Sequence, residues 1–172
     1  MGDYPCRKIY RGFARKKSMN RYVELREKHQ NRVSKLPIGF AIGEKDFREM
    51  MEKWGLDPEK DLDKICQISK IAFAQKKDIN LISETMQKNW EEMKEARKNR
   101  EFLYDMFVAE MHNHEYSLTW DLKEVLDDLN ITMEDIVTNP IMREELIKAD
   151  MHIREEAYWP SSPEEMSIRN EA

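Results

Sequence analysis

The segment from residue 102 to residue 129 constrains the fold most, because it contains two predicted helices joined by a polar turn. Between residues 102 and 111 apolar side chains occupy most sides of a helix, which predicts a buried helix. Asp121 and Glu124 have the spacing of an N-cap residue and its reciprocal partner, so the second helix is predicted to begin near residue 121. Its apolar stripe follows the i, i+3, i+4, i+7 spacing: Leu122, Val125, Leu126 and Leu129.

The rest of the chain predicts more helices and little sheet. Only 5 Gly and 6 Pro accompany 37 % charged residues, which favours long helices over many short strands. The short apolar run 37–42 predicts a buried strand. In the segment 64–75 the second half is compatible with a strand paired to that run, and the first half equally with a helix. We therefore predict an α+β fold, predominantly α, consisting of a helical domain with a small two- or three-stranded sheet.

Further helices are expected around this core of the chain. Residues 44–54 form one amphipathic helix, which Gly55 ends in the left-handed conformation. Thr132 and Asn139 mark the starts of two others, the second reaching about residue 158. The helix from about 78 to 99 has a predicted buried stripe: Ile79, Ile82, Met86, Trp90, Met93 and Ala96.

Charge divides the chain unevenly. Residues 1–36 contain 11 Lys and Arg against 3 Asp and Glu, a net charge of +8, whereas residues 37–172 have a net charge of −13. The two parts are expected to attract one another or different partners. We predict a basic N-terminal arm and helix over 1–36, one globular domain over 37–158 and a C-terminal tail over 159–172.

The basic arm is the predicted nucleic-acid or partner-binding segment. Its cations are interleaved with Tyr4, Tyr10 and Phe13. Segments that bind nucleic acids combine cations, which bind phosphates, with aromatic rings, on which bases stack. The alternatives are an arm lying across the acidic remainder of the chain, or a solvated terminus. The binding candidates are Arg7, Lys8, Arg11, Arg15, Lys16, Lys17 and Arg21.

The polar turn contains the one cluster of histidine and carboxylate residues in the sequence. On an extended backbone His112 and His114 would share a face, but spacing nominates no third metal ligand. The alternative is structural: Asn113 ends the buried helix in a left-handed turn, and the side chains after it bond to loop backbone. No phosphate-binding loop, dinucleotide-binding motif or nucleophile elbow is present, so we assign no catalytic residue, metal or cofactor and favour binding over catalysis. The turn residues are Asn113, His114, Glu115 and Tyr116.

The runs EFLYDMFVAEMHNHEYSLTWDLKEVLDDLNIT and PIGFAIGEKDFREMMEKWGL resemble a family of small proteins carried by phages, plasmids and conjugative elements of Firmicutes. The likeness covers roughly residues 37 to 137. The family's motif falls on Phe107, Asn113, His114, Glu115, Tyr116 and Asp121.

This resemblance implies an accessory protein of a mobile element that acts by binding. We expect an inhibitor of a bacterial defence system, such as a CRISPR nuclease, whose partner is the nuclease or its guide-RNA complex. The alternative is a nucleic-acid-binding or RNA-processing protein that uses the basic arm. We further expect a cytoplasmic protein of the bacterial host cell with no disulfide and no membrane segment, and a homodimer is compatible with the sequence.

Overall fold

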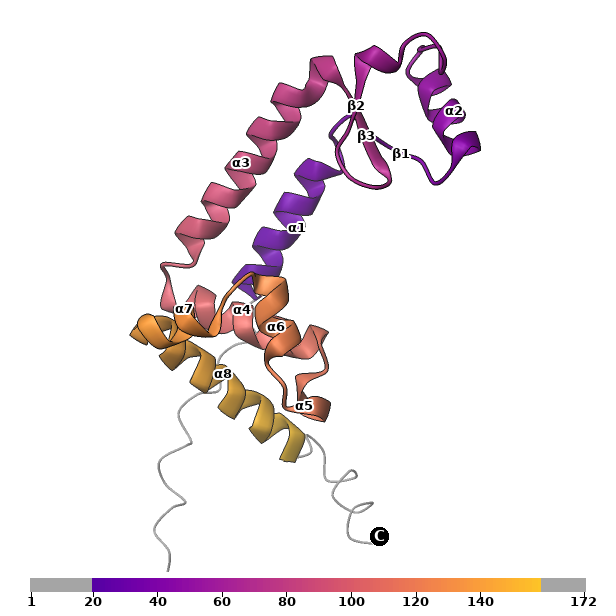
Figure 1. Ribbon diagram of the computed structural model, residues 1–172. Helices are drawn as coiled ribbons and strands as arrows, with labels where there is room; N and C mark the ends of the chain where they lie inside the picture. Colours follow the sequence, from indigo (N-terminus) through magenta and orange to yellow (C-terminus); the bar gives the residue numbers. More distant parts are fainter. Residues whose placement is uncertain (1–19, 159–172) are drawn as a thin grey trace, which may run out of the picture. The chain divides into compact units, whose positions relative to one another are not determined.

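The computed structural model describes residues 20–158, which are predominantly helical with one three-stranded antiparallel sheet (Figure 1). This confirms the predicted fold class. The chain forms two compact units, one of residues 25–103 and one that combines the residues up to 24 with those from 104 onward. We call the described parts the sheet unit (25–103) and the acidic unit (20–24 and 104–158). These boundaries differ from the division at residue 36 that the charge distribution suggested.

The sheet has the strand order β1-β3-β2, with both outer strands antiparallel to β3. Strand β1 is Ile38–Phe40, β2 is Ile65–Gln67 and β3 is Ala72–Gln75. The 3-10 turns η2 (Leu62–Lys64) and η3 (Lys76–Asp78) flank the β2–β3 hairpin. Both halves of the ambiguous segment 64–75 are therefore strands, and its second half pairs with β1 as the sequence suggested.

Helix α2 (Glu44–Lys53) packs its apolar side against this sheet. Its fully buried Met51 belongs to one core cluster with Ile65 of β2. After the helix, Gly55 has φ 70°, and the N–H of Leu56 donates to the carbonyl of Met51 at 2.9 Å, as expected for a helix ended by glycine. Gly39 lies so close to the Met50 side chain that an added Cβ would overlap it.

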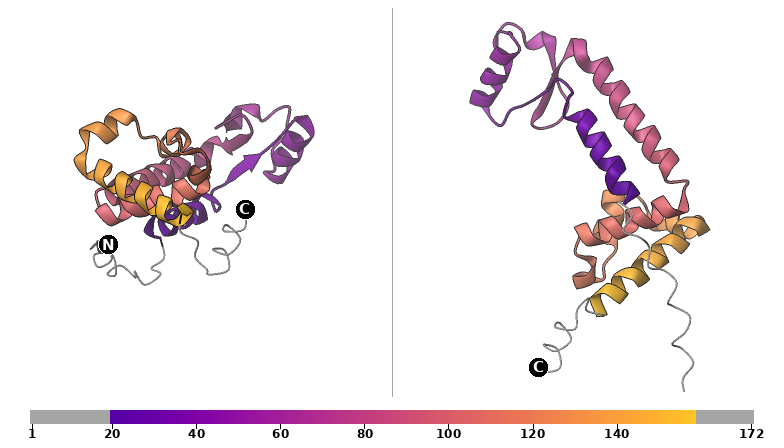
Figure 2. Two further views of the ribbon diagram at one scale, coloured as in Figure 1. Left: turned by 90° about the horizontal axis from the view of Figure 1, so that it is seen from below. Right: turned by 180° about the vertical axis from the view of Figure 1, so that it is seen from behind.

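Helices α1 (Arg21–Val33) and α3 (Ile79–Ala96) lie side by side in both views, joined by polar contacts (Figure 2). Arg32 donates to Glu92 at 2.8 Å and to the buried Asn89 at 2.9 Å. The predicted stripe of α3 is therefore wrong in part, because Met86 and Trp90 are exposed by 42 % and 57 %. The neighbouring helix presents a guanidinium, so polar residues of α3 take the facing positions.

The described residues of the acidic unit form helices joined by short turns, and none of them is in a strand. Helix α4 begins in the sheet unit and continues through residues 104–113. Two helices are capped at their N-termini as predicted: Thr132 and Asp135 make a capping box, and Asn139 accepts the N–H of Met142 at 3.1 Å. The helices are α4 (Arg100–Asn113), α5 (Tyr116–Thr119), α6 (Lys123–Leu129), α7 (Met133–Thr138) and α8 (Pro140–Tyr158).

Helix α6 starts two residues later than predicted, and the expected capping box of Asp121 and Glu124 does not form. Asp121 Oδ1 instead accepts the N–H of Lys123 at 2.8 Å, while the Glu124 carboxylate lies beside His114. Among the described residues, no helix has the length and apolar character needed to span a membrane.

The Glu92 ion pairs predict a pH-dependent stability. The hydrogen bond from Arg32, with further ones from Lys28 and His29, lowers the pKa of Glu92 to about 2 against burial, which raises it. Glu92→Gln should lower the free energy of unfolding at neutral pH by about 1.5–3 kcal/mol, the range for hydrogen bonds to charged groups. Because the folded pKa lies below the ordinary 4.5, this stabilisation is present above that value and is lost as the pH falls toward 2.

Urea denaturation should therefore show that the difference in the free energy of unfolding between the wild type and the variant shrinks as the pH falls through this window. Glu91→Gln is the matched control, because Glu91 is exposed and its carboxylate accepts from Gln87 on the same helix. A difference that does not change with pH would contradict the assignment.

Candidate functional site

The end of helix α4 forms the candidate site. Helical bonding continues one residue past α4, because the N–H of His114 donates to the carbonyl of Glu110 at 3.0 Å. The chain then reverses at Glu115, whose φ of 48° is left-handed, and enters α5. The prediction that Asn113 makes the left-handed turn is therefore wrong. Asn113 stays helical, and its side chain can then reach back over the last turn.

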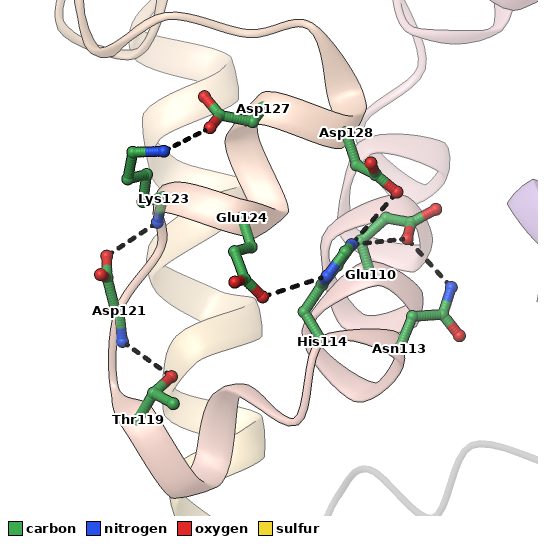
Figure 3. A network of polar contacts seen from close by, with 9 residues as sticks. All are labelled: Glu110, Asn113, His114, Thr119, Asp121, Lys123, Glu124, Asp127 and Asp128. Atoms are coloured by element: carbon green, nitrogen blue, oxygen red, sulfur yellow. Dashed lines mark hydrogen bonds and ion pairs between the residues drawn. The ribbon is translucent and has the colours of Figure 1, made fainter.

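A buried carboxylate lies at the centre of the site. Glu110 is 1 % exposed. Its Oε1 accepts a hydrogen bond from the Tyr22 hydroxyl. Its Oε2 accepts from Asn113 Nδ2 at 2.9 Å (Figure 3). A buried charge is tolerated only with such partners. Glu110 therefore ties the first turn of α1 to the last turn of α4.

His114 lies among three carboxylates (Figure 3). Its Nε2 is 3.2 Å from Asp128 Oδ2 and 3.8 Å from Glu110 Oε2, and its Nδ1 is 3.6 Å from Glu124 Oε2. The ligand atoms of Glu110, His114 and Asp128 all lie within 4.8 Å of one another, an arrangement that can hold a metal ion. Alternatively, the ring of His114 only hydrogen-bonds to Asp128, at 3.2 Å, and the cluster holds no ion.

Asp128 and Glu124 were not nominated from the sequence, although a signal was present. Glu110 and His114 are four residues apart, and so are Glu124 and Asp128, which places each pair on one helix face. The sequence does not show how these two faces meet, because the meeting depends on the left-handed residues Glu115 and Trp120 on either side of α5.

The two histidines of the turn are not brought together. His112 belongs to α4, where its Nε2 lies 2.8 Å from Glu156 of α8, whereas His114 faces α6. Residues two apart on a helix point in different directions, so the extended-backbone prediction of a shared face is wrong. Glu156 also contacts His152 at 3.2 Å.

Tyr116 fastens α5 to α8. Its buried hydroxyl donates to Asp150 Oδ1 at 2.8 Å, and Arg154 Nε donates to the same carboxylate. Burial raises the pKa of Asp150, but the hydrogen bonds from Arg154 and Tyr116 outweigh it, and the pKa is lowered overall. The Arg154 guanidinium also lies 4.5 Å from the ring of Trp120, which packs edge-to-face on Tyr116. The Tyr116 side chain is therefore buried and hydrogen-bonded, as expected of a residue that stabilises the fold.

Of the seven basic binding candidates, Arg21 alone lies within the described residues. Arg21 is the first residue of α1, and its N–H donates to Asp105 Oδ2 at 3.1 Å. Asn20 caps the same helix by accepting the N–H of Val23 at 3.0 Å. The other candidates lie outside the described residues: Arg7, Lys8, Arg11, Arg15, Lys16 and Lys17.

Comparison with known proteins gives one match. Residues 21–152 match the model of a family described as a family of unknown function, DUF7659. No curated protein and no solved structure matches the chain.

The Tyr116 contacts predict a stability effect. Tyr116→Phe should lower the free energy of unfolding by about 1–3 kcal/mol, because it removes a donor from a partly buried carboxylate. Tyr158→Phe is the control, since Tyr158 is exposed and stacks on Trp120 through its ring. Chemical denaturation of both variants would measure the difference, and equal stabilities would contradict a structural role for the hydroxyl.

Proposed function

We propose a function for this chain, which belongs to the DUF7659 family of unknown function, from the chemistry of its own surface. The protein acts by binding: the acidic unit docks on a positively charged, nucleic-acid-binding surface of a partner protein. Such surfaces occur on the nucleases of bacterial defence systems, CRISPR nucleases included. Occupying one would make the protein an inhibitor carried by a mobile element, in keeping with the resemblance found in the sequence.

The concentration of charge in one unit is the observation on which the proposal rests. Between residues 104 and 158 the chain has 14 Asp and Glu against 4 Lys and Arg, a net charge of −10. The sheet unit, residues 25–103, has 15 acids against 17 bases and is nearly neutral. The acidity of the protein therefore belongs to one compact unit.

Pairing leaves most of this negative charge uncompensated. Ten of the fourteen acids are exposed, and three of the four bases bind acids of the same unit. Residues 121–135 contain six acids and a single base, Lys123. These six exposed side chains form what we call the acidic face: Asp121, Glu124, Asp127, Asp128, Glu134 and Asp135.

An acidic face of this kind suits a partner that normally binds phosphates. A field of one sign attracts an oppositely charged surface over about a Debye length and raises the association rate constant. Complementary charge also favours the correct partner over others. A basic channel that accommodates a nucleic-acid backbone offers this complementarity, and a bound protein would compete with the nucleic acid for it.

Charge reversal on the acidic face tests the proposal. Glu124→Lys with Glu134→Lys should slow association with the partner by about tenfold or more at low salt, because steering depends on local charge. The control pair, Glu84→Lys with Glu91→Lys, makes the same change in net charge on exposed positions of α3. Affinity capture from a bacterium carrying defence systems would supply the partner, and surface plasmon resonance across a salt series would measure the rates.

If both double variants bind as the wild type does, the acidic face is not the docking surface. Deleting residues 1–17 tests the alternative function, nucleic-acid binding through the basic arm. The deletion removes six cations and one acid and leaves the described residues intact. A nucleic-acid-binding protein should then lose affinity for RNA or DNA together with much of its salt dependence. If capture of the partner is abolished by nuclease treatment and by this truncation, the basic arm and not the acidic face is the working part.

A further inference from the structure

We propose that Glu110, His114 and Asp128 form a binding site for a divalent first-row transition metal ion. Of Zn²⁺, Mn²⁺ and Mg²⁺, we expect Zn²⁺ to bind most tightly. The site shares Asp128 with the acidic face, but binding of an ion there does not require the proposed docking function. Two ligands come from the end of α4 and one from α6 (Figure 3).

The distances between the ligand atoms suit such an ion. Metal–nitrogen and metal–oxygen bonds of about 2.0–2.2 Å place neighbouring ligand atoms roughly 3–3.6 Å apart. His114 Nε2 lies 3.2 Å from Asp128 Oδ2 and 3.8 Å from Glu110 Oε2, and all three atoms lie within 4.8 Å of one another. Asp128 is exposed, so rotation of its side chain can bring its carboxylate closer to that of Glu110. The distance between His114 and Glu110 is slightly longer than an ion would set it, so the His114 ring would also have to shift.

The site has the supporting contacts that metal centres use. Glu110 is almost fully buried, and the Tyr22 hydroxyl and the Asn113 amide fix its carboxylate. The other ring nitrogen of His114 faces Glu124 at 3.6 Å, and a carboxylate in that position orients a ligating imidazole and makes it more basic. A patch of exposed acids has neither the buried ligand nor the oriented ring.

The ligand types select the class of ion. Carboxylate oxygens alone suit Ca²⁺ and Mg²⁺, whereas an imidazole together with carboxylates suits Zn²⁺, Mn²⁺ and related ions. The net charge of −10 in this unit further attracts a cation. Bound there, the ion would join α6 to the end of α4, and three protein ligands would leave a coordination position for water.

Isothermal titration of the chelator-treated full chain with Zn²⁺, Mn²⁺ and Mg²⁺ tests the proposal. The wild type should bind one Zn²⁺ per chain, more weakly Mn²⁺ and weakest of all Mg²⁺. His114→Gln and Asp128→Asn should each weaken Zn²⁺ binding by more than about 100-fold, since loss of a supporting contact alone weakens it by about 10–100-fold. Thermal unfolding with and without Zn²⁺ should give a stabilisation that both variants lose.

Two controls separate this site from diffuse attraction and from a second histidine pair. Asp127→Asn changes the neighbouring carboxylate, which binds Lys123 and lies outside the cluster, and should leave the affinity within about twofold. His152→Gln removes a histidine that shares Glu156 with His112 and should also leave it unchanged. The proposal is overturned if no saturable one-to-one binding is seen, if Asp127→Asn and Asp128→Asn lose affinity equally, or if His152→Gln abolishes binding and His114→Gln does not.

Discussion

The buried carboxylate of Glu110 is the constraint on which the acidic unit depends. Removing such a group from water costs several kcal/mol unless hydrogen bonds replace the lost hydration. Tyr22 supplies one from α1 and Asn113 another from the last turn of α4, while His114 presents its ring from the residue after that helix. Two segments of the chain, the start of α1 and residues 110–114, therefore meet at one side chain. The motif that prompted a functional interpretation of the sequence supplies two of those partners, so its residues have a structural role before any other.

The same arrangement explains how a unit with net charge −10 remains compact. Self-repulsion opposes folding when one sign of charge dominates. Three of the four bases within the unit bind nearby acids, as with Lys148 and Glu145 or Arg154 and Asp150, and His114 faces carboxylates of both α4 and α6. The side chains of the acidic face stay exposed to solvent, although Asp127 binds Lys123 and two others face His114. A cation at His114, or a basic partner on the acidic face, would relieve the repulsion that remains, and both proposals therefore follow from a single electrostatic property.

Local patterns predicted the elements well, but not the pairing of their faces. The glycine that ends α2 and the Thr132 capping box depend on residues within one turn, so the sequence sufficed for them. The exposed Trp90 of α3 was misplaced because the facing helix presents Arg32, which a single-helix periodicity cannot reveal. For the same reason spacing nominated no third ligand near His114: Asp128 lies 14 positions away, beyond α5 and the left-handed residues Glu115 and Trp120 that flank it.

A double-mutant cycle on Tyr22 and Glu110 tests the central claim most directly. The free energy of unfolding would be measured for Tyr22→Phe, Glu110→Gln and the combination, with chelator present so that no ion contributes. If the buried carboxylate organises the unit through these contacts, the two changes should be coupled by about 1–3 kcal/mol, in the range found for residues of one hydrogen-bond network. Effects that add within about 0.5 kcal/mol would contradict the account, because Glu110 would then be buried without depending on Tyr22.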